Sequence, residues 1–468
     1  MSSGGALLRN VLSSIGGRLA ATVLGVATFA ILARAVGPHG LGQYRTVLTM
    51  VLFAGALFEF GLYPVLLQGL ARGGDGTYVG QVVGLRLASS AAGVLLLGLL
   101  VQWLEPDPLV RLGVFVAGTG WIGQQLNEVL RALFQQRLAR YASAIAETLG
   151  AAVTFSLVLA FGILGGGTDA MLLATALGML ATGAVAWRLA LRRVRFRPLF
   201  DAVAWRRLLK AGLPFAGSAL LLAVHFRIDV LLLSLWRPSI DVGLYDAPAK
   251  LYELVFMVPY LLGGALMPLF ARDLEPPGGT LAPRLHAAAG VVLLYGLMVQ
   301  ALFLVHASHI TALLGGPQFH ASGPALRVLG AAAMLAGLCA VLRHAATAAA
   351  RERAMVRVDL ASVAAAVLLH CVLIPRWGIL GAASGKLGGD AVRTLLTLWL
   401  LRDHVGFPAA SGVLRALLPA AGFGGALWLL DLLGIHWLLA VAACSLLAGG
   451  ACLALPSIRR GVVALSTG

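Results

Sequence analysis

The sequence predicts an all-α integral membrane protein with about 14 transmembrane helices, arranged as two six-helix bundles around a central cavity plus two C-terminal helices. Three observations support this fold class. Of the 468 residues, 60% are hydrophobic and 12% are charged, whereas soluble globular proteins carry about 25% charged residues. The apolar residues fall into runs of about 20, the length of a membrane-spanning helix. A short motif also recurs in the two halves of the chain.

The apolar runs define the expected order of the membrane spans. They cover residues 9–34, 45–70, 80–103, 109–133, 142–164, 169–190, 210–236, 246–270, 285–306, 323–346, 354–374, 379–401, 409–430 and 434–456. The first run is too long for a cleaved signal peptide and is followed at once by another, so we expect it to be retained. The composition excludes a soluble enzyme, a nucleic-acid-binding domain and a disordered chain.

The charge distribution predicts the orientation of the spans. The net charge is +16, and the basic residues lie between apolar runs rather than on a soluble domain, so we expect no nucleic-acid partner. The longest connection contains eight of them, Arg188, Arg192, Arg193, Arg195, Arg197, Arg206, Arg207 and Lys210. The positive-inside rule places this loop in the cytoplasm. Counting spans outward from it places both termini there as well.

A repeated motif predicts an internal duplication. Gly42 and Tyr44 recur as Gly243 and Tyr245, each pair between two predicted spans and separated by 201 positions. Six spans lie between the copies, so the two halves have the same orientation, as in transporters built from parallel repeats. The predicted domains are an N-terminal bundle at 1–192, a basic cytoplasmic linker at 193–210, a C-terminal bundle at 211–403 and two appended helices at 404–468.

No pattern predicts an enzyme, a cofactor or a metal site. There is no Walker loop, no CxxC pair and no histidine spacing typical of metal ligands. The four cysteines lie in apolar runs, where small buried residues are expected. The chemistry of the chain is therefore expected among its intramembrane polar residues.

Ionisable residues at membrane depth are the informative set. Each costs about 2.5–3.5 kcal/mol at the centre of a membrane helix on insertion scales, so such residues face protein or water. The expected cation set for an anionic substrate is Arg18, Arg86, Arg227, Lys386 and Arg393. The expected polar set, for the cavity or for ion coupling, is Glu59, Asn127, Glu128, Glu147, His225, Asp229 and Asp390. We expect these residues to line a polar, largely cationic cavity.

Helical spacing pairs several of these groups. Glu128 with Arg131 and Lys250 with Glu253 are three residues apart, so each pair can form an ion pair on one helix face. Two interpretations stay open for such pairs, a structural ion pair that lowers the insertion cost and a role in binding substrate. Two further sets of residues also have the spacing of one helix face. Lys386, Asp390 and Arg393 share one face, and His225 can meet Asp229 to relay a proton or bind a coupling cation.

Unpaired arginines in a cavity favour an anionic substrate. The guanidinium group is planar, remains charged at any relevant pH and binds phosphate oxygens through two hydrogen bonds. Arg18 and Arg86 have no partner at helical spacing in their own spans, although snorkelling toward the near surface explains them equally well.

Four segments carry a resemblance to a known family. They are LARAVGPHGLGQYRTVL (32–48), RIDVLLLSL (227–235), VGLYDAPAKLYELVFMVPYLLGGALMPLFAR (242–272) and IPRWGILGAASGKLGG (374–389). The chain resembles the bacterial polysaccharide transporters, the flippases for undecaprenyl-diphosphate-linked oligosaccharides in the multidrug/oligosaccharidyl-lipid/polysaccharide exporter superfamily. The resemblance implies two six-helix bundles facing a cavity whose cations bind the diphosphate sugar head group. It assigns no single residue as a binding residue.

The resemblance and the charge pattern together predict a function. We expect a multi-pass protein of the bacterial inner membrane that moves a lipid-linked oligosaccharide by alternating access, for surface polysaccharides such as O-antigen of lipopolysaccharide. Coupling to a proton or sodium gradient, or to the membrane potential, is a hypothesis. Expected partners are the glycan lipid, membrane lipids, a polysaccharide polymerase and glycosyltransferases. The alternatives are a multidrug or small-metabolite exporter of the same superfamily and a membrane-bound oligosaccharide polymerase or ligase.

Overall fold

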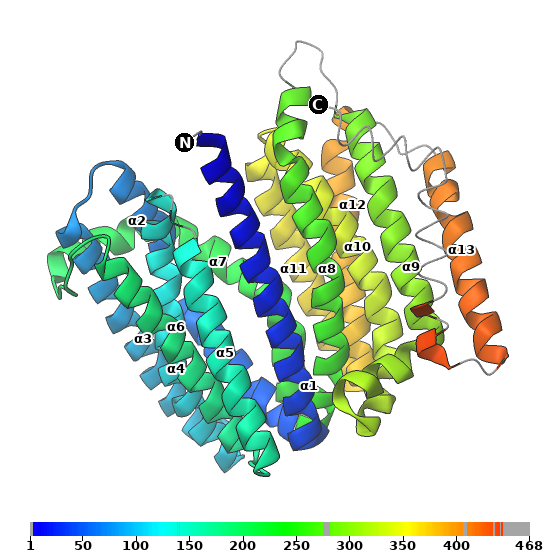
Figure 1. The fold of residues 1–468 in the computed structure, drawn as a ribbon, viewed down its shortest axis with the longest axis horizontal. Coiled ribbons are helices and arrows are strands. Elements are labelled where there is room, and N and C mark those ends of the chain that lie inside the picture. Colours follow the sequence, from blue (N-terminus) through cyan, green and yellow to red (C-terminus); the bar gives the residue numbers. More distant parts are fainter. Residues whose placement is uncertain are drawn as a thin grey trace. The chain divides into compact units, whose positions relative to one another are not determined.

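The computed structural model describes residues 3–137, 139, 141–274, 281–405, 410–433, 436–439 and 441–442, with side chains from Thr22 onward except those of 404–418 and a few isolated positions. Within these residues the chain forms helices and no strand (Figure 1). The predicted all-α fold is therefore confirmed. Eight helices of this part are long and apolar enough to cross a membrane. The predicted span 434–456 lies almost entirely outside the described residues.

The helices group into two compact units, one of residues 1–234 with 238–243 and the other of residues 235–237 with 244–468. The first contains α1 (Ser3–Leu57), α2 (Leu62–Ala71), α3 (Gly76–Leu104), α4 (Pro108–Gln136), α5 (Tyr141–Ile163), α6 (Thr168–Leu191) and most of α7 (Ala202–Trp236). The second contains most of α8 (Ser239–Asp273), α9 (Ala282–Gly315), the 3₁₀ helix η1 (Pro317–Ser322), α10 (Gly323–Ala348), α11 (Glu352–Trp377), α12 (Ile379–Val405) and α13 (Ala410–Leu432). The domain limits read from the sequence stay a prediction, although α7 begins inside the expected linker.

Aspartates start three helices of the first unit. The carboxylate of Asp75 accepts a hydrogen bond from the backbone N–H of Tyr78, and that of Asp107 accepts one from Leu109. Asp201 accepts two, from the next turn of α7. An acidic side chain at this position satisfies free backbone donors and interacts favourably with the helix dipole. The backbone donor holds the pKa of the Asp75 carboxyl below its usual range.

The span expected at 45–70 is interrupted in the structure. Its helix ends at Leu57 and resumes at Leu62 as α2. Phe60 and Gly61 adopt φ values of 51° and 60° at the break, where α7 approaches so closely that a Cβ on Gly61 would lie 2.6 Å from the carbonyl oxygen of Gly212. Continuous apolar sequence hides this break because its cause is a contact with a helix about 150 residues away.

The two copies of the repeated motif contact each other. α1 bends at Gly37, where φ is 68° and ψ is −177°, so the expected connection at 35–44 is a bend within one helical element. A Cβ on Gly42 would lie 1.7 Å from the carbonyl oxygen of Ser239, and a Cβ on Gly243 would lie 1.8 Å from that of Pro38. Positions 38 and 42 and positions 239 and 243 thus meet reciprocally, as an internal duplication produces.

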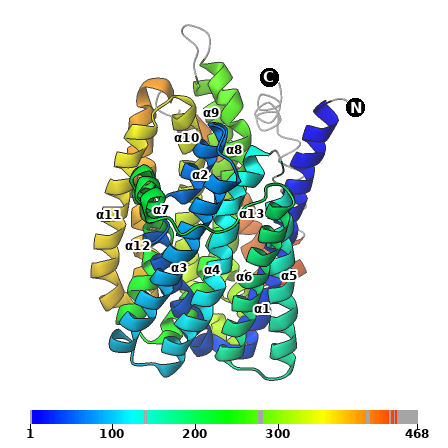
Figure 2. The ribbon, with the colours of Figure 1, turned by 90° about the vertical axis from the view of Figure 1, so that its left-hand side faces the viewer.

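Each unit has its own apolar core. In the first, buried side chains such as Val65, Leu130 and Phe134 pack α2, α3 and α4 together. In the second, Phe270, Leu285 and other buried residues join α8, α9, α10 and α11, and α13 packs on α9 (Figures 1 and 2). These cores leave specific faces of α4 and α12 for polar side chains.

Candidate functional site

A polar face runs along α4 in the first unit. Between positions 123 and 135 every residue is buried except Gln124, Glu128, Arg131 and Gln135. Their spacing of three or four residues places them on one side of the helix. Because the remaining faces of α4 pack against its neighbours, this accessible face would meet lipid tails only at a high cost. We infer that it borders water or a polar ligand.

An ion pair lies at the centre of this face. Glu128 and Arg131 are bonded at 2.8 Å, and each side chain is 37% exposed. The helical spacing predicted this pair, and the structure confirms it. At the end of the face, the hydroxyl of Tyr63 on α2 donates to Gln135 at 2.6 Å. The face is therefore held in place but remains accessible.

Behind this face lies a buried hydrogen-bonded group. Asn127 is fully buried and donates to a carboxylate oxygen of Glu147 on α5 at 3.4 Å. Ser143 donates to the same oxygen at 3.0 Å. The carbonyl oxygen of the Asn127 side chain has no hydrogen-bond partner in the described structure. Two residues expected to be polar and intramembrane thus bond to each other across α4 and α5.

Arg86 binds the backbone at the break between α1 and α2. Its side chain is buried on α3 and donates to the carbonyl oxygens of Phe58 and Glu59, at 3.3 and 3.1 Å, and to that of Gln125 at 3.4 Å. The carbonyl groups at a helix end lack partners within the helix, and the guanidinium group supplies donors for them. In this conformation Arg86 stabilises the backbone, and a role in binding substrate stays a prediction.

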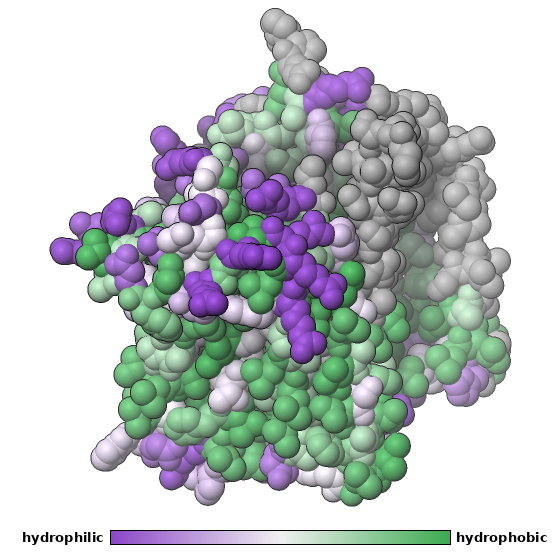
Figure 3. Space-filling model, turned by 60° about the vertical axis from the view of Figure 1, so that its left-hand side comes forward, coloured by the Kyte–Doolittle hydropathy of each residue, from purple (hydrophilic) through white to green (hydrophobic). Residues whose placement is uncertain are grey.

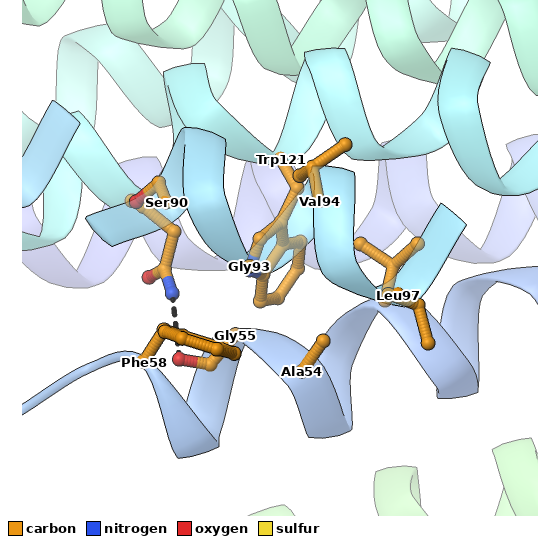
Figure 4. A pocket seen from close by; sticks show the side chains of 10 residues that line it. Ala54, Gly55, Phe58, Ser90, Gly93, Val94, Leu97 and Trp121 are labelled. Atoms are coloured by element: carbon orange, nitrogen blue, oxygen red, sulfur yellow. Dashed lines mark hydrogen bonds between the residues drawn. The ribbon is translucent and has the colours of Figure 1, made fainter. Parts of the chain in front are cut away.

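A small cavity lies between α1, α3 and α4 beside this group (Figure 4). It is lined mainly by apolar residues such as Val94 and Leu97. Gln125 at its edge donates to the carbonyl oxygen of Gly55 at 3.3 Å (Figure 4). No charged residue lines it, so it does not suit an anionic head group.

The second unit contains a cluster of two arginines and one aspartate. The carboxylate of Asp359 on α11 accepts two hydrogen bonds from Arg343 on α10, at 2.7 and 2.8 Å. It also accepts two from Arg393 on α12, at 2.9 and 3.1 Å. The cluster carries a net positive charge, and the Arg343 side chain is 38% exposed. Arg343 uses one guanidinium nitrogen for Asp359, so its other N–H groups could bind an anion.

Lys386 and Asp390 share a tyrosine partner beside this cluster. The hydroxyl of Tyr252 on α8 donates to Asp390 at 2.8 Å, and the Lys386 ammonium lies 5.2 Å from the centre of the Tyr252 ring. Asp390 is almost fully buried. Residues of the ladder predicted on one face of α12 thus contact other helices. Lys386 and Asp390 contact Tyr252 on α8, and Arg393 contacts Asp359 on α11.

α8 presents a row of aromatic rings next to an ion pair. Tyr252, Phe256 and Tyr260 follow one another at ring distances of 6.4 and 5.8 Å. Lys250 and Glu253 pair at 3.3 Å and are about a third exposed, 31% and 30%. This second spacing-based ion pair is also confirmed.

The remaining predicted residues are on α1 and α7. The side chain of Arg18 lies outside the described part of the structure. His225 and Asp229 are buried on α7, with Arg227 half-buried between them, and Asp229 accepts a hydrogen bond from the backbone N–H of Val230. Their pairing as a relay stays a prediction. Among the described residues, no group of three or more His, Cys, Asp or Glu side chains is placed to hold a metal ion.

Sequence reasoning missed Arg343 and Tyr252. Arg343 falls at the end of a predicted span, where an arginine is typical of an interface and not of a site. Tyr252 has no charge and no partner at helical spacing. Both contact their partners across helices, so periodicity within one span could not identify them.

The comparisons with known proteins decide the family. Residues 7–273, more than half of the 468, match the family described as polysaccharide biosynthesis protein. The chain belongs to this family. The match confirms the resemblance carried by the sequence motifs. No curated protein shares significant sequence similarity with the chain.

Solved structures show the same fold. The chain is similar to the lipid II flippase MurJ in an inward closed conformation, with a TM-score of 0.78, 11% identity and coverage of 95% of this chain and 99% of that one. It is also similar to an inward-facing multidrug resistance MATE family transporter of the MOP superfamily, with a TM-score of 0.58, 15% identity and coverage of 86% and 95%. A Vibrio cholerae MATE transporter gives 0.56 at 15% identity, with 85% and 96% covered. The chain is thus a multi-pass membrane protein with the fold of these transporters.

Proposed function

We propose that this protein is a flippase that moves an undecaprenyl-diphosphate-linked oligosaccharide across the bacterial cytoplasmic membrane. The observation that carries the proposal is the accessible polar face of α4, with Glu128 and Arg131, in a chain of the polysaccharide biosynthesis family. A hydrophilic head group crossing a bilayer needs such a surface because hydrocarbon offers it no hydrogen bonds.

Charged and polar groups of each unit suit the chemistry of such a head group. Arginine binds phosphate oxygens in a bidentate manner, and the Arg343–Asp359–Arg393 cluster carries more cationic than anionic groups. Carboxylates and amides, such as Glu128 and Gln124 on the α4 face, can hydrogen-bond sugar hydroxyls. The lipid tail would remain in the bilayer. Alternating access would expose the head group first to one side of the membrane and then to the other.

The setting of the reaction is part of the same proposal. The basic connection at 188–210 supports a cytoplasmic position for that end of the first unit and for both termini. Glycosyltransferases would supply the substrate and a polysaccharide polymerase would consume it, for products such as O-antigen. A proton gradient, a sodium gradient or the membrane potential would supply the energy, with His225, Asp229 and Asp390 as the candidate coupling groups.

Reconstitution tests the proposal directly. The full chain in proteoliposomes is supplied with a polyprenyl-diphosphate oligosaccharide, and a membrane-impermeant glycosidase reports how much reaches the outer surface. We expect translocation by the native chain and a large loss in the double variant Glu128→Gln/Arg131→Gln. The matched control is Glu352→Gln/Arg353→Gln, an exposed pair at the start of α11, which should keep activity. Absence of translocation by a folded native chain refutes the proposal.

The same vesicles distinguish the proposed flippase from a multidrug or small-metabolite exporter. A cationic drug or small metabolite is offered in place of the glycan lipid, and its uptake is measured. Drug transport without glycan translocation would assign the chain to the multidrug exporters. Collapsing the ion gradients with ionophores tests the coupling hypothesis, and unchanged glycan translocation would overturn it.

A further inference from the structure

An extended segment is bound along a groove of α3 in the first unit. Gly76, Gly80 and Gly84 are spaced four residues apart on α3, and a Cβ on each would lie 2.2 Å from a backbone carbonyl oxygen of the segment 195–199. The backbone N–H of Leu199 donates to the carbonyl oxygen of Gly80 at 3.0 Å. Only glycine allows a backbone to approach a helix this closely, so the position of the segment is closely determined.

Aromatic side chains anchor both ends of this segment. Phe196 is buried against Trp187 of α6, with ring centres 5.0 Å apart. Trp205 in the first turn of α7 donates its indole N–H to the carbonyl oxygen of Gln81 at 3.2 Å and contacts Phe200. The segment and the start of α7 are therefore fixed on α3.

This anchored segment carries a dense basic surface. Every cationic side chain between positions 188 and 210 is exposed, and they are Arg188, Arg192, Arg193, Arg195, Arg197, Arg206, Arg207 and Lys210. The single acidic residue of the stretch, Asp201, caps α7 through two backbone N–H groups. We call these eight residues the basic surface. Its charge is not balanced by acidic residues of the same stretch.

Exposed apolar side chains lie among these cations. Phe200 is 72% exposed, Val203 69% and Leu213 68%. Hydrophilic side chains gather in a band above a broad hydrophobic area on the face shown in Figure 3. The first turns of α7 have a buried side with Ala204 and Leu208, and they precede Pro214. Basic residues mixed with exposed apolar ones on such a helix are typical of a segment at the membrane interface.

The length of α7 supports this placement. A helix of 35 residues is about 50 Å long at about 1.5 Å per residue, whereas the hydrocarbon core is about 30 Å thick. The excess length leaves room for the cationic turns before Pro214 to lie among the phosphate groups.

We propose that the basic surface is a binding site for anionic phospholipid head groups of the adjacent leaflet, with Phe200, Val203 and Leu213 inserted beside them. The occupant is a bulk anionic lipid such as phosphatidylglycerol. Phosphate groups match the guanidinium donors, and acyl chains match the apolar side chains. Nucleic acid would satisfy the charges but would leave the apolar side chains in water. The site uses residues outside the α4 face, so it does not depend on the proposed transport function.

Native mass spectrometry of the delipidated full chain in detergent tests the proposal. Phosphatidylglycerol and phosphatidylcholine with identical acyl chains are titrated separately, and the ratio of bound lipids is measured. We expect a preference for phosphatidylglycerol that falls steeply between about 0.1 M and 1 M salt, as the Debye length shrinks from about 10 to 3 Å. The variant Arg195→Gln/Arg197→Gln/Arg206→Gln should lower the preference by up to about 125-fold, because each surface cation contributes about fivefold.

Two further variants locate the effect. Arg195→Lys/Arg197→Lys/Arg206→Lys keeps the charge and should retain most of the preference. The control Arg34→Gln/Arg327→Gln/Arg376→Gln removes three exposed charges elsewhere and should leave it unchanged. An equal loss in this control would show an effect of net charge and would overturn the site. A native preference that is absent or insensitive to salt would also overturn the proposal. Binding of an added oligonucleotide by a chain that shows no lipid preference would overturn it as well.

Discussion

The cluster of Arg343, Asp359 and Arg393 allows a quantitative prediction. One carboxylate accepts four hydrogen bonds from two guanidinium groups on different helices. The substitution Asp359→Asn keeps the shape of the side chain and removes its charge. Both arginines then face a neutral amide whose NH₂ group can only donate, so the cluster loses the negative charge that Asp359 supplies to both of them.

The Arg393–Asp359 and Arg343–Asp359 ion pairs differ in burial, and this difference determines how much each contributes to stability. The Arg393 and Asp359 side chains are 11% and 14% exposed, and removal of one partner from a buried pair costs about 3–5 kcal/mol. The Arg343 side chain is 38% exposed, so its half of the interaction is screened and contributes about 0.2–1 kcal/mol. We therefore expect Asp359→Asn to destabilise the protein several times more than Arg343→Gln.

Thermal unfolding in detergent, followed by the loss of the monodisperse chromatographic peak, measures this difference. About 1 kcal/mol lowers the melting temperature of a unit of 150–250 residues by about 2–4 °C. We expect a decrease of about 6–20 °C for Asp359→Asn and about 0.4–4 °C for Arg343→Gln. The matched control Asp403→Asn removes an exposed carboxylate from α12 and should change little. Equal decreases for Asp359→Asn and the control would refute the reasoning.

Three further substitutions test other contacts by the same thermal assay. Glu147→Ala deprives buried Asn127 of its acceptor and should cost about 1–3 kcal/mol, whereas Glu147→Gln, which keeps an oxygen, should lie near the native value. Gly42→Ala places a Cβ 1.7 Å from a backbone oxygen and should prevent normal folding. The control Gly25→Ala meets nothing within 4 Å and should be tolerated. Equal tolerance of both substitutions would contradict the close helix contact. Arg86→Lys keeps the charge but loses the fork of donors, so amide hydrogen exchange at residues 58–61 should accelerate; unchanged protection would contradict the role of Arg86 at the break.

Contacts within one helix were predictable from the sequence. Glu128 with Arg131 and Lys250 with Glu253 lie three residues apart, and helix geometry alone places them together. The partner of Arg393, in contrast, lies on another helix and could not be predicted in this way. Asp359 is 34 positions away on another helix, and its pairing depends on how α11 and α12 pack.

The break in the helix at 45–70 and the close contacts between helices could not be predicted from the sequence. The apolar run at 45–70 contains no signal strong enough to predict its interruption, because the break depends on contact with α7 and on the donors of Arg86. The repeated glycines at 42 and 243 were visible as a pattern, but their reciprocal contact was not. A pattern records which positions are equivalent, whereas a contact requires the distance between them.

The sequence by itself determined that the chain is a helical membrane protein of the polysaccharide biosynthesis family, because hydropathy and short motifs are local properties. Only the tertiary structure decided which groups on other helices several of the intramembrane charges contact. Arg86 binds backbone oxygens, Arg393 shares a carboxylate with Arg343, and Arg131 lies on an accessible face. The physical reason is that another helix supplies the partner of such a charge through packing, which a local sequence pattern does not record.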